Sequence, residues 1–193
     1  MFINKFPFVI AEVGLNHEGD ISVAKKLIDV AKDTGCGAVK FQLRSPQTFK
    51  KVKGHRDIGS EIVDEYISKT FLELETYKNL YIYAEETGIP CIFSAWDFES
   101  VEFAIALNPP AFKIASADLR NTLLIQKLIK TGKHLIFSTG MSTEKEINDT
   151  INYLNANEAD FTLLHCHSAY PAPPHHLNLS YIKTLQEKCA NPV

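Results

Sequence analysis

Short apolar runs recur along the chain, and each of them ends in polar residues. The first run starts at Phe8, reaches a carboxylate at Glu12 and opens into a polar loop punctuated by Gly14 and Gly19. Five later runs share this layout, and they cover residues 39–42, 92–94, 112–116, 136–139 and 161–166. Apolar runs of this length bounded by glycine are typical of parallel strands that are covered on both faces. We therefore predict six buried strands, each of which leads into polar side chains.

Between these runs, the apolar residues follow a helical spacing. Ala24, Leu27, Ile28 and Ala31 would share one helix face, and Gly35 stands where a C-terminal cap belongs. Comparable patterns predict helices over residues 71–88, 99–107, 124–132, 143–154 and 181–185, and the fourth of these opens with the capping box Thr143-x-x-Glu146. Residues 44–69 form a long excursion to which the pattern assigns no structure.

Strict alternation of strands and helices predicts a parallel sheet with right-handed crossovers. A doubly wound open sheet often carries a glycine-rich phosphate turn, and neither G-x-G-x-x-G nor G-x-x-x-x-G-K-[ST] occurs here. A (β/α)8 TIM-type barrel draws its site residues from the ends of many strands, as this chain does. We therefore expect one α/β domain over residues 1–193, a partial barrel with about six of the eight strand and helix units.

Composition narrows the function classes. A chain of 193 residues with 45% hydrophobic content can bury the core of one domain. The net charge of −3 and the single short basic cluster at residues 50–53 give no reason to expect nucleic acid as a partner. No apolar segment has the length of a signal peptide core or a membrane span, and the four cysteines form no C-x-x-C pair. We expect a cytoplasmic protein that binds neither nucleic acid nor a membrane.

Polar side chains at the strand ends would meet at one mouth of such a barrel. They combine cations, acids, an amide and hydroxyls, and they are Glu12, Lys40, Gln42, Ser94, Lys113, Ser116, Asp118, Ser138 and Tyr170. Because side chains alternate along a strand, Lys40 and Gln42 share one face. Two lysines on buried strands suit a small anion with a phosphate or carboxylate group, since a buried ammonium group needs a counter-charge. Lys40 and Lys113 are therefore predicted to bind the anion.

Simpler roles remain open for several of these residues. Glu12 could be a carboxylate that pairs with a neighbouring lysine for structure alone, and His17 could brace its loop. Serines at strand ends often bond only local backbone. His165 and His167 could bind a metal ion, but strand alternation equally gives one core histidine and one loop histidine.

Five motifs in sequence order resemble those of the sialic acid synthase family, the phosphoenolpyruvate-condensing enzymes that make nonulosonic acids. They read AEVGLNHEGD at 11–20, AVKFQ at 38–42, AFKIAS at 111–116, STGM at 138–141, and LHC at 164–166 followed by YPAP at 170–173. Such enzymes join phosphoenolpyruvate to an open-chain N-acetyl amino sugar, for example N-acetylmannosamine, with a divalent metal, Mn²⁺ or Mg²⁺. The resemblance extends over nearly the whole chain and concerns the family's barrel domain.

The resemblance also implies a role for each matching residue. Glu12 would act near the reacting carbon as an acid or base, or orient water. Phosphoenolpyruvate would be held by Lys40, Gln42, Ser94, Lys113, Ser116 and Ser138. Asp118 and Tyr170 would face the sugar.

Some family features differ here. Ser116-Ala117-Asp118 stands where the family has Ser-Gly-Glu, and Ser94-Ala95-Trp96-Asp97-Phe98 stands where it has S-T-P-F-D. No asparagine occurs between residues 44 and 78 to contact the sugar. The family's two metal-binding histidines and its antifreeze-like domain follow later strands, so we expect metal ligands outside this chain. The isolated chain is predicted not to turn over, or to do so only if a partner supplies the remainder, and a homodimer is expected.

Two other functions compete with this one. A lysine-lined barrel could be an aldolase in which Lys40 or Lys113 forms a Schiff base with a carbonyl substrate. An incomplete barrel could instead be a non-catalytic binding or assembly module, since open edges at the first and sixth strands would favour self-association.

Overall fold

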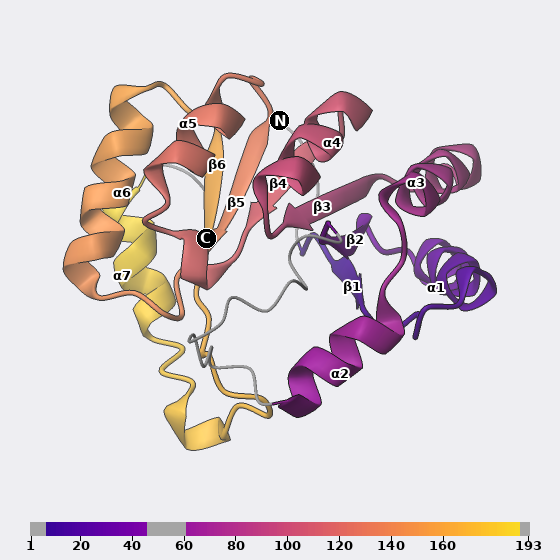
Figure 1. The fold of residues 1–193 in the computed structure, drawn as a ribbon. Helices are drawn as coiled ribbons and strands as arrows, with labels where there is room; N and C mark the ends of the chain where they lie inside the picture. Colours follow the sequence, from indigo (N-terminus) through magenta and orange to yellow (C-terminus); the bar gives the residue numbers. More distant parts are fainter. Residues whose placement is uncertain (1–6, 46–60, 190–193) are drawn as a thin grey trace. The chain divides into compact units, whose positions relative to one another are not determined.

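The computed structural model describes residues 7–45 and 61–189, and its ribbon is drawn in Figure 1. The chain divides into two compact units, which are essentially Ile3–Pro110 and Ala111–Val193. In each unit, parallel strands alternate with helices, as the hydrophobic pattern predicts.

The first unit is built around three parallel strands, of which β2 pairs with both β1 and β3. In chain order, its elements are β1 (Ile10–Gly14), α1 (Ile21–Asp33), β2 (Ala38–Leu43), α2 (Glu61–Thr70), α3 (Leu74–Thr87), β3 (Cys91–Ala95) and α4 (Phe98–Leu107). All but one of the six residues of the middle strand are buried, and Lys40 is among the buried ones. Apolar Val39 and Phe41 alternate in this strand with Lys40 and Gln42, which share the opposite face.

Local signals set the ends of the helices in this unit. The carboxylate of Asp20 accepts hydrogen bonds from the backbone N–H groups of Ser22 (2.7 Å) and Val23 (3.4 Å), which caps α1. Gly35 follows α1 with φ +78°, and Gly88 ends α3 with φ +77°, in the left-handed conformation that favours glycine. Both predicted glycine stops are confirmed.

The second unit has the same build. Its strand β5 (His134–Ser138) pairs in parallel with β4 (Ala111–Ile114) and β6 (Phe161–Leu164). Its helices are α5 (Thr122–Ile129), α6 (Glu144–Ala156) and α7 (Tyr181–Lys188), with 3₁₀ turns at Ser116–Asp118 and Pro174–His176. All five residues of β5 are buried. At the core, the rings of Phe137 and Phe161 meet edge to face with centroids 6.5 Å apart.

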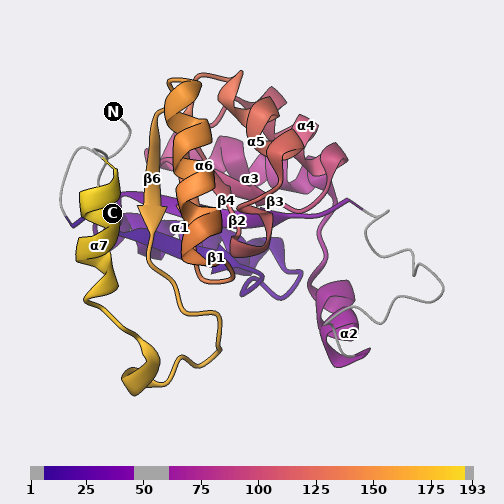
Figure 2. The ribbon, with the colours of Figure 1, turned by 90° about the vertical axis from the view of Figure 1, so that its left-hand side faces the viewer.

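Helices α6 and α7 lie side by side in Figures 1 and 2. Lys188 of α7 pairs with Glu144 at the start of α6, and its ammonium group also donates to the side chain of Asn148 at 3.1 Å. At the N-terminus of α6, the predicted capping box is present: Thr143 Oγ1 accepts from the backbone of Glu146, whose carboxylate accepts from the backbone N–H of Thr143.

Several predicted boundaries are wrong. The sixth strand ends at Leu164 rather than at Cys166, and the fourth ends at Ile114, so Ser116 belongs to a 3₁₀ turn. The helix after β4 covers 122–129 instead of 124–132. Within the excursion, residues 61–69 are helical, in α2, whereas residues 46–60 lie outside the described part of the chain.

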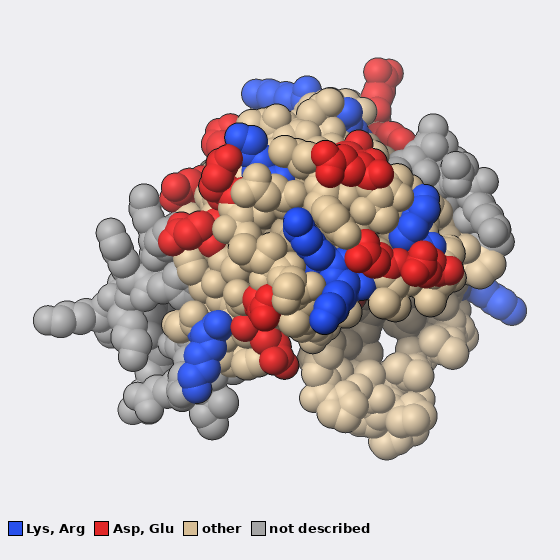
Figure 3. Space-filling view, turned by 90° about the vertical axis from the view of Figure 1, so that its right-hand side faces the viewer, with Lys and Arg blue, Asp and Glu red and all other residues tan. Residues whose placement is uncertain are grey.

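Charges of both signs are interspersed on the face drawn in Figure 3, without a broad basic area. This distribution agrees with the net charge of −3. Among the helices of the described residues, none is long and apolar enough to cross a bilayer.

Candidate functional site

Glu12 lies at a bulge near the end of β1. The pairing of β1 with β2 places Glu12 beside Lys40, and the register then shifts so that Gly14 faces Phe41. Gly14 has φ +53°, and a Cβ atom built on it would stand 2.8 Å from Oε1 of Glu12. Glycine is therefore favoured at this position, because an L side chain would be strained at this φ and would displace the Glu12 carboxylate.

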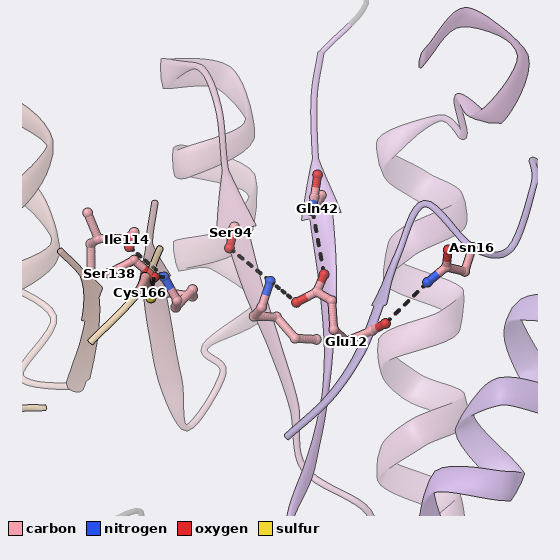
Figure 4. Close-up of polar contacts among 9 residues, drawn as sticks. Glu12, Asn16, Gln42, Ser94, Ile114, Ser138 and Cys166 are labelled. Atoms are coloured by element: carbon pink, nitrogen blue, oxygen red, sulfur yellow. Dashed lines mark hydrogen bonds and ion pairs between the residues drawn. The ribbon is translucent and has the colours of Figure 1, made fainter. Parts of the chain in front are cut away.

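Four of the predicted site residues meet at the carboxyl ends of β1, β2 and β3, and Figure 4 labels Glu12, Gln42 and Ser94 among them. Lys40 is 8% exposed and forms an ion pair with Glu12, while its Nζ also donates to Ser94 Oγ at 3.4 Å. Nε2 of Gln42 donates to Oε1 of Glu12 at 3.5 Å. We call Glu12, Lys40, Gln42 and Ser94 the acid–lysine cluster.

A second group in Figure 4 belongs to the second unit. Lys113 Nζ donates to Ser138 Oγ at 2.6 Å and to the carbonyl oxygen of Ile114 at 2.7 Å. Sγ of Cys166 donates to the same Ser138 hydroxyl at 3.3 Å. We call Lys113, Ser138 and Cys166 the lysine–serine cluster. An ammonium group, a hydroxyl and a thiol here provide donors for an anion.

The other three candidates have mainly local contacts. Ser116 Oγ accepts from the backbone N–H of Gly140 at 3.2 Å, next to the lysine–serine cluster. Asp118 Oδ1 accepts from the side chain of Asn121 at 3.0 Å, and Asn121 in turn caps α5. Tyr170 is 96% exposed, and within the described residues no hydrogen bond joins it to another candidate. Contact of Asp118 and Tyr170 with a sugar stays a prediction. A single cavity shared by Glu12, Lys40 and Lys113 also stays a prediction.

His17 braces its loop, as predicted. It is fully buried, and its Nδ1 accepts a hydrogen bond from the backbone N–H of Gly19 at 3.1 Å. Its Nε2 lies 3.2 Å from the hydroxyl of Tyr77. Burial lowers the pKa of His17, so the ring is neutral near pH 7. With Nδ1 accepting, the proton of the neutral ring lies on Nε2 and is donated to Tyr77.

Comparison with known proteins agrees with the family resemblance that the sequence motifs indicate. The model of the NeuB family matches residues 27–193. The chain belongs to the NeuB family. It is 43% identical over 180 residues to an uncharacterized protein of Methanocaldococcus jannaschii, and this match covers 93% of this chain and 51% of that protein. It is 35% identical over 193 residues to the N,N'-diacetyllegionaminic acid synthase of Campylobacter jejuni. This match covers 95% of this chain and 58% of the synthase. The chain thus spans about half the length of these relatives.

The fold agrees with the family. The crystal structure of a sialic acid synthetase from Leptospira borgpetersenii serovar Hardjo-bovis, in complex with citrate, matches with a TM-score of 0.85 at 28% identity. The match covers 96% of this chain and 62% of the synthetase. The predicted parallel α/β fold is confirmed as the one that NeuB-type synthetases share, and the six strands are consistent with part of a barrel.

The described residues do not fit a metal site. Among residues 7–45 and 61–189, no group of three or more histidine, cysteine, aspartate or glutamate side chains could hold an ion. His165 is occupied by a contact of its Nε2 with the carbonyl oxygen of Leu177 at 2.7 Å, and His167 packs instead against His176, with ring centroids 5.7 Å apart. The alternative that His165 and His167 form a metal site is therefore not supported in this NeuB chain.

Sequence reasoning missed two polar residues beside the clusters. Cys166 enters the sequence analysis only as part of the LHC motif, yet its thiol contacts Ser138. Arg44 begins the excursion to which the pattern assigns no structure, and its guanidinium stacks 4.3 Å from the ring centroid of Trp96. The position of Arg44, two residues after Gln42 in the alternation of β2, was a usable signal.

Proposed function

We propose that this chain binds phosphoenolpyruvate and takes part in its condensation with an N-acetyl amino-sugar aldehyde to a nonulosonic acid. The observation that carries the proposal is the acid–lysine cluster, in which Lys40 and Glu12 stand side by side at the strand ends. Membership of the NeuB family, with a legionaminic acid synthase among the relatives, supports the choice of reaction.

Each cluster would supply a different part of the chemistry. Lys40 and Lys113 neutralise the carboxylate and phosphate of phosphoenolpyruvate, and the hydroxyls of Ser94 and Ser138 orient them. The enol carbon forms a bond with the aldehyde carbon, whose oxygen takes up a proton. Water then adds to the resulting oxocarbenium carbon, and phosphate leaves as its C–O bond breaks. Glu12 would accept a proton from that water or orient it.

The Schiff-base alternative is weaker in this structure. A lysine attacks a carbonyl only through an unprotonated amine, whereas Lys40 is ion-paired with a carboxylate and Lys113 donates two hydrogen bonds. Borohydride treatment in the presence of pyruvate is expected to leave the mass of the protein unchanged. A covalent adduct on either lysine would favour the aldolase.

The proposal is tested by calorimetric titration of the purified chain with phosphoenolpyruvate. Lys40→Gln and Lys113→Gln should each weaken binding at least about tenfold, because each removes a charge-assisted hydrogen bond. Lys145→Gln removes the same charge from an exposed pair with Asp149 on α6 and should leave the affinity unchanged. The absence of phosphoenolpyruvate binding, or equal losses in all three variants, would contradict the proposal.

The divalent metal and the homodimer are part of the same proposal. Because the described residues contain no candidate ligand group, no step above is assigned to a metal, and its ligands would lie elsewhere. A homodimer is expected, with light scattering as the measurement.

A further inference from the structure

Cys166 lies two residues beyond the end of β6 and has no part in the reaction steps above. Its side chain nevertheless reaches the lysine–serine cluster, where Sγ donates to Ser138 Oγ at 3.3 Å, as Figure 4 shows. The same hydroxyl accepts from Lys113 Nζ at 2.6 Å. Cys166 is therefore in direct contact with a group that is proposed to bind phosphoenolpyruvate.

The backbone at the ends of β5 and β6 holds Cys166 in this place. Thr139 binds the carbonyl oxygen of Leu164 twice, through its backbone N–H at 3.2 Å and through its hydroxyl at 2.9 Å. Next to it, Gly140 packs closely on the loop after β6, since a Cβ atom built on Gly140 would stand 2.8 Å from the carbonyl oxygen of Cys166. These contacts do not involve the thiol, so a smaller side chain at Cys166 should leave the loop in position.

The Ser138 hydroxyl has used its full capacity to accept hydrogen bonds. A serine hydroxyl has two lone pairs for accepting and one proton for donating. Lys113 and Cys166 occupy the two lone pairs, whereas the proton of Ser138 finds no acceptor among residues 7–45 and 61–189. Because Ser138 is only 9% exposed, a donor left without an acceptor costs free energy that a ligand with an acceptor oxygen would recover.

The same two hydrogen bonds fix the direction of this proton. With both lone pairs engaged, one tetrahedral position is left around Oγ of Ser138, and the O–H bond points there, away from Lys113 and Cys166. Without the thiol, the hydroxyl could rotate and its proton could take the position that now faces Cys166. A donor that is fixed before the ligand arrives pays no cost of orientation on binding.

The lysine–serine cluster suits a small oxyanion. Lys113 and Cys166 are only partly buried, so the cluster is not sealed from solvent. Lys113 supplies a positive charge, and Ser138 supplies the fixed O–H donor beside it. Hydrogen bonds from hydroxyl and ammonium groups to a charged oxygen are stronger than those to a neutral one, which favours a phosphate or carboxylate group.

We propose that Cys166 is a positioning residue, which fixes the hydroxyl of Ser138 as a donor to the phosphate group of phosphoenolpyruvate. The identity of the anion rests on the proposed function, whereas the direction of the Ser138 proton rests on the hydrogen bonds of the cluster. Cys166 acts through Ser138, since its own proton is already donated to that hydroxyl.

Two substitutions at Cys166 distinguish this role from packing. Cys166→Ala and Cys166→Ser both lose the volume of the sulfur atom, but only the serine keeps a proton to donate to Ser138. In calorimetric titrations with phosphoenolpyruvate, Cys166→Ala should bind about three- to tenfold more weakly than the wild type. Cys166→Ser should bind within about twofold of the wild type, because the hydrogen bond is restored.

Cys36→Ala is the matched control. The thiol of Cys36 is also partly exposed and lies 3.8 Å from a hydroxyl, that of Thr34, but it belongs to the first unit. This variant should bind phosphoenolpyruvate as the wild type does. Thermal unfolding of each variant reports whether it is folded.

Combination with Ser138→Ala tests whether Cys166 acts through the hydroxyl. Ser138→Ala should itself weaken binding, and addition of Cys166→Ala should then weaken it no further, because the group that the thiol orients is gone. Additive losses in the double variant would overturn the positioning role.

Inorganic phosphate, titrated in parallel, separates this inference from the proposed function. Equal affinities in Cys166→Ala and Cys166→Ser would overturn the positioning role, whereas phosphoenolpyruvate binding would still support the proposed reaction. Conversely, a chain that binds only inorganic phosphate, with the loss in Cys166→Ala and the recovery in Cys166→Ser, would uphold the positioning role and remove the reaction. If the wild type binds neither anion, both are wrong.

Discussion

Single residues set the geometry of the acid–lysine cluster. Gly14 allows Glu12 to turn towards Lys40, because its φ of +53° and its missing side chain leave room for the carboxylate. The pattern of the sequence shows a glycine after the first strand, but not which atom occupies the space of its Cβ. That space is filled by a side chain two residues earlier, which only the bulge brings there.

Replacement of Gly14 by alanine is therefore expected to be costly. Gly14→Ala should lower the free energy of unfolding by at least about 2 kcal/mol, from the left-handed conformation and the overlap with Glu12 together. Gly35→Ala is the matched control, since Gly35 also has a positive φ, of +78°, but nothing lies within 4 Å of its Cβ position. It should cost about 1 kcal/mol. Urea denaturation measures both, and equal losses would show that the Glu12 overlap is unimportant.

The buried His17 predicts a pH dependence of stability. Its folded-state pKa is lowered by desolvation, so the unfolded chain binds more protons below the ordinary value of about 6.5. The stability contributed by neutral His17 is complete above that value and is lost as the pH falls below it. Wild-type protein should therefore unfold at lower urea concentration at pH 5 than at pH 7.5.

Comparison with His17→Gln isolates this contribution from that of the other histidines. The variant is less stable at both pH values, because it loses the bonds to Gly19 and Tyr77, but the difference between pH 5 and pH 7.5 should shrink. An unchanged difference would assign the pH dependence to other groups.

At the scale of single elements, helix ends follow the rules of capping. Thr143 and Glu146 were recognisable from their spacing alone, because a capping box depends only on residues within one turn. Strand ends were less predictable. The segments after β4 and β6 continue with apolar and polar residues as before, yet pairing stops at Ile114 and Leu164. Strand length depends on the partner strand, and the partner is distant in sequence.

The capping box is expected to carry measurable stability. Thr143→Ala should lower the free energy of unfolding by about 1 kcal/mol, since the backbone N–H of Glu146 loses its acceptor. Ser180→Ala serves as control, because Ser180 begins α7 without a side-chain cap bond to the helix. It should change stability by less than about 0.5 kcal/mol in the same urea experiment. A similar loss in both variants would argue against the cap.

At the scale of the whole molecule, the chain spans about half the length of its curated relatives. We expect the purified chain to bind phosphoenolpyruvate but to release no phosphate when N-acetylmannosamine is added, since the described residues lack a metal-ligand group. A phosphate assay with added Mn²⁺ measures this. Phosphate release by the chain alone would contradict the expectation.

Sequence alone determined the alternation of strands and helices, the caps, and the polar strand ends that carry Glu12, Lys40 and Lys113. These features depend on periodicity and on neighbours within a few residues, so the local sequence is sufficient to predict them. Tertiary structure decided which of these groups bond to one another, as in the Glu12 and Lys40 pair. It also decided that the buried His17 ring bonds to both Gly19 and Tyr77. Such contacts join residues up to 60 positions apart, and only folding determines their distance.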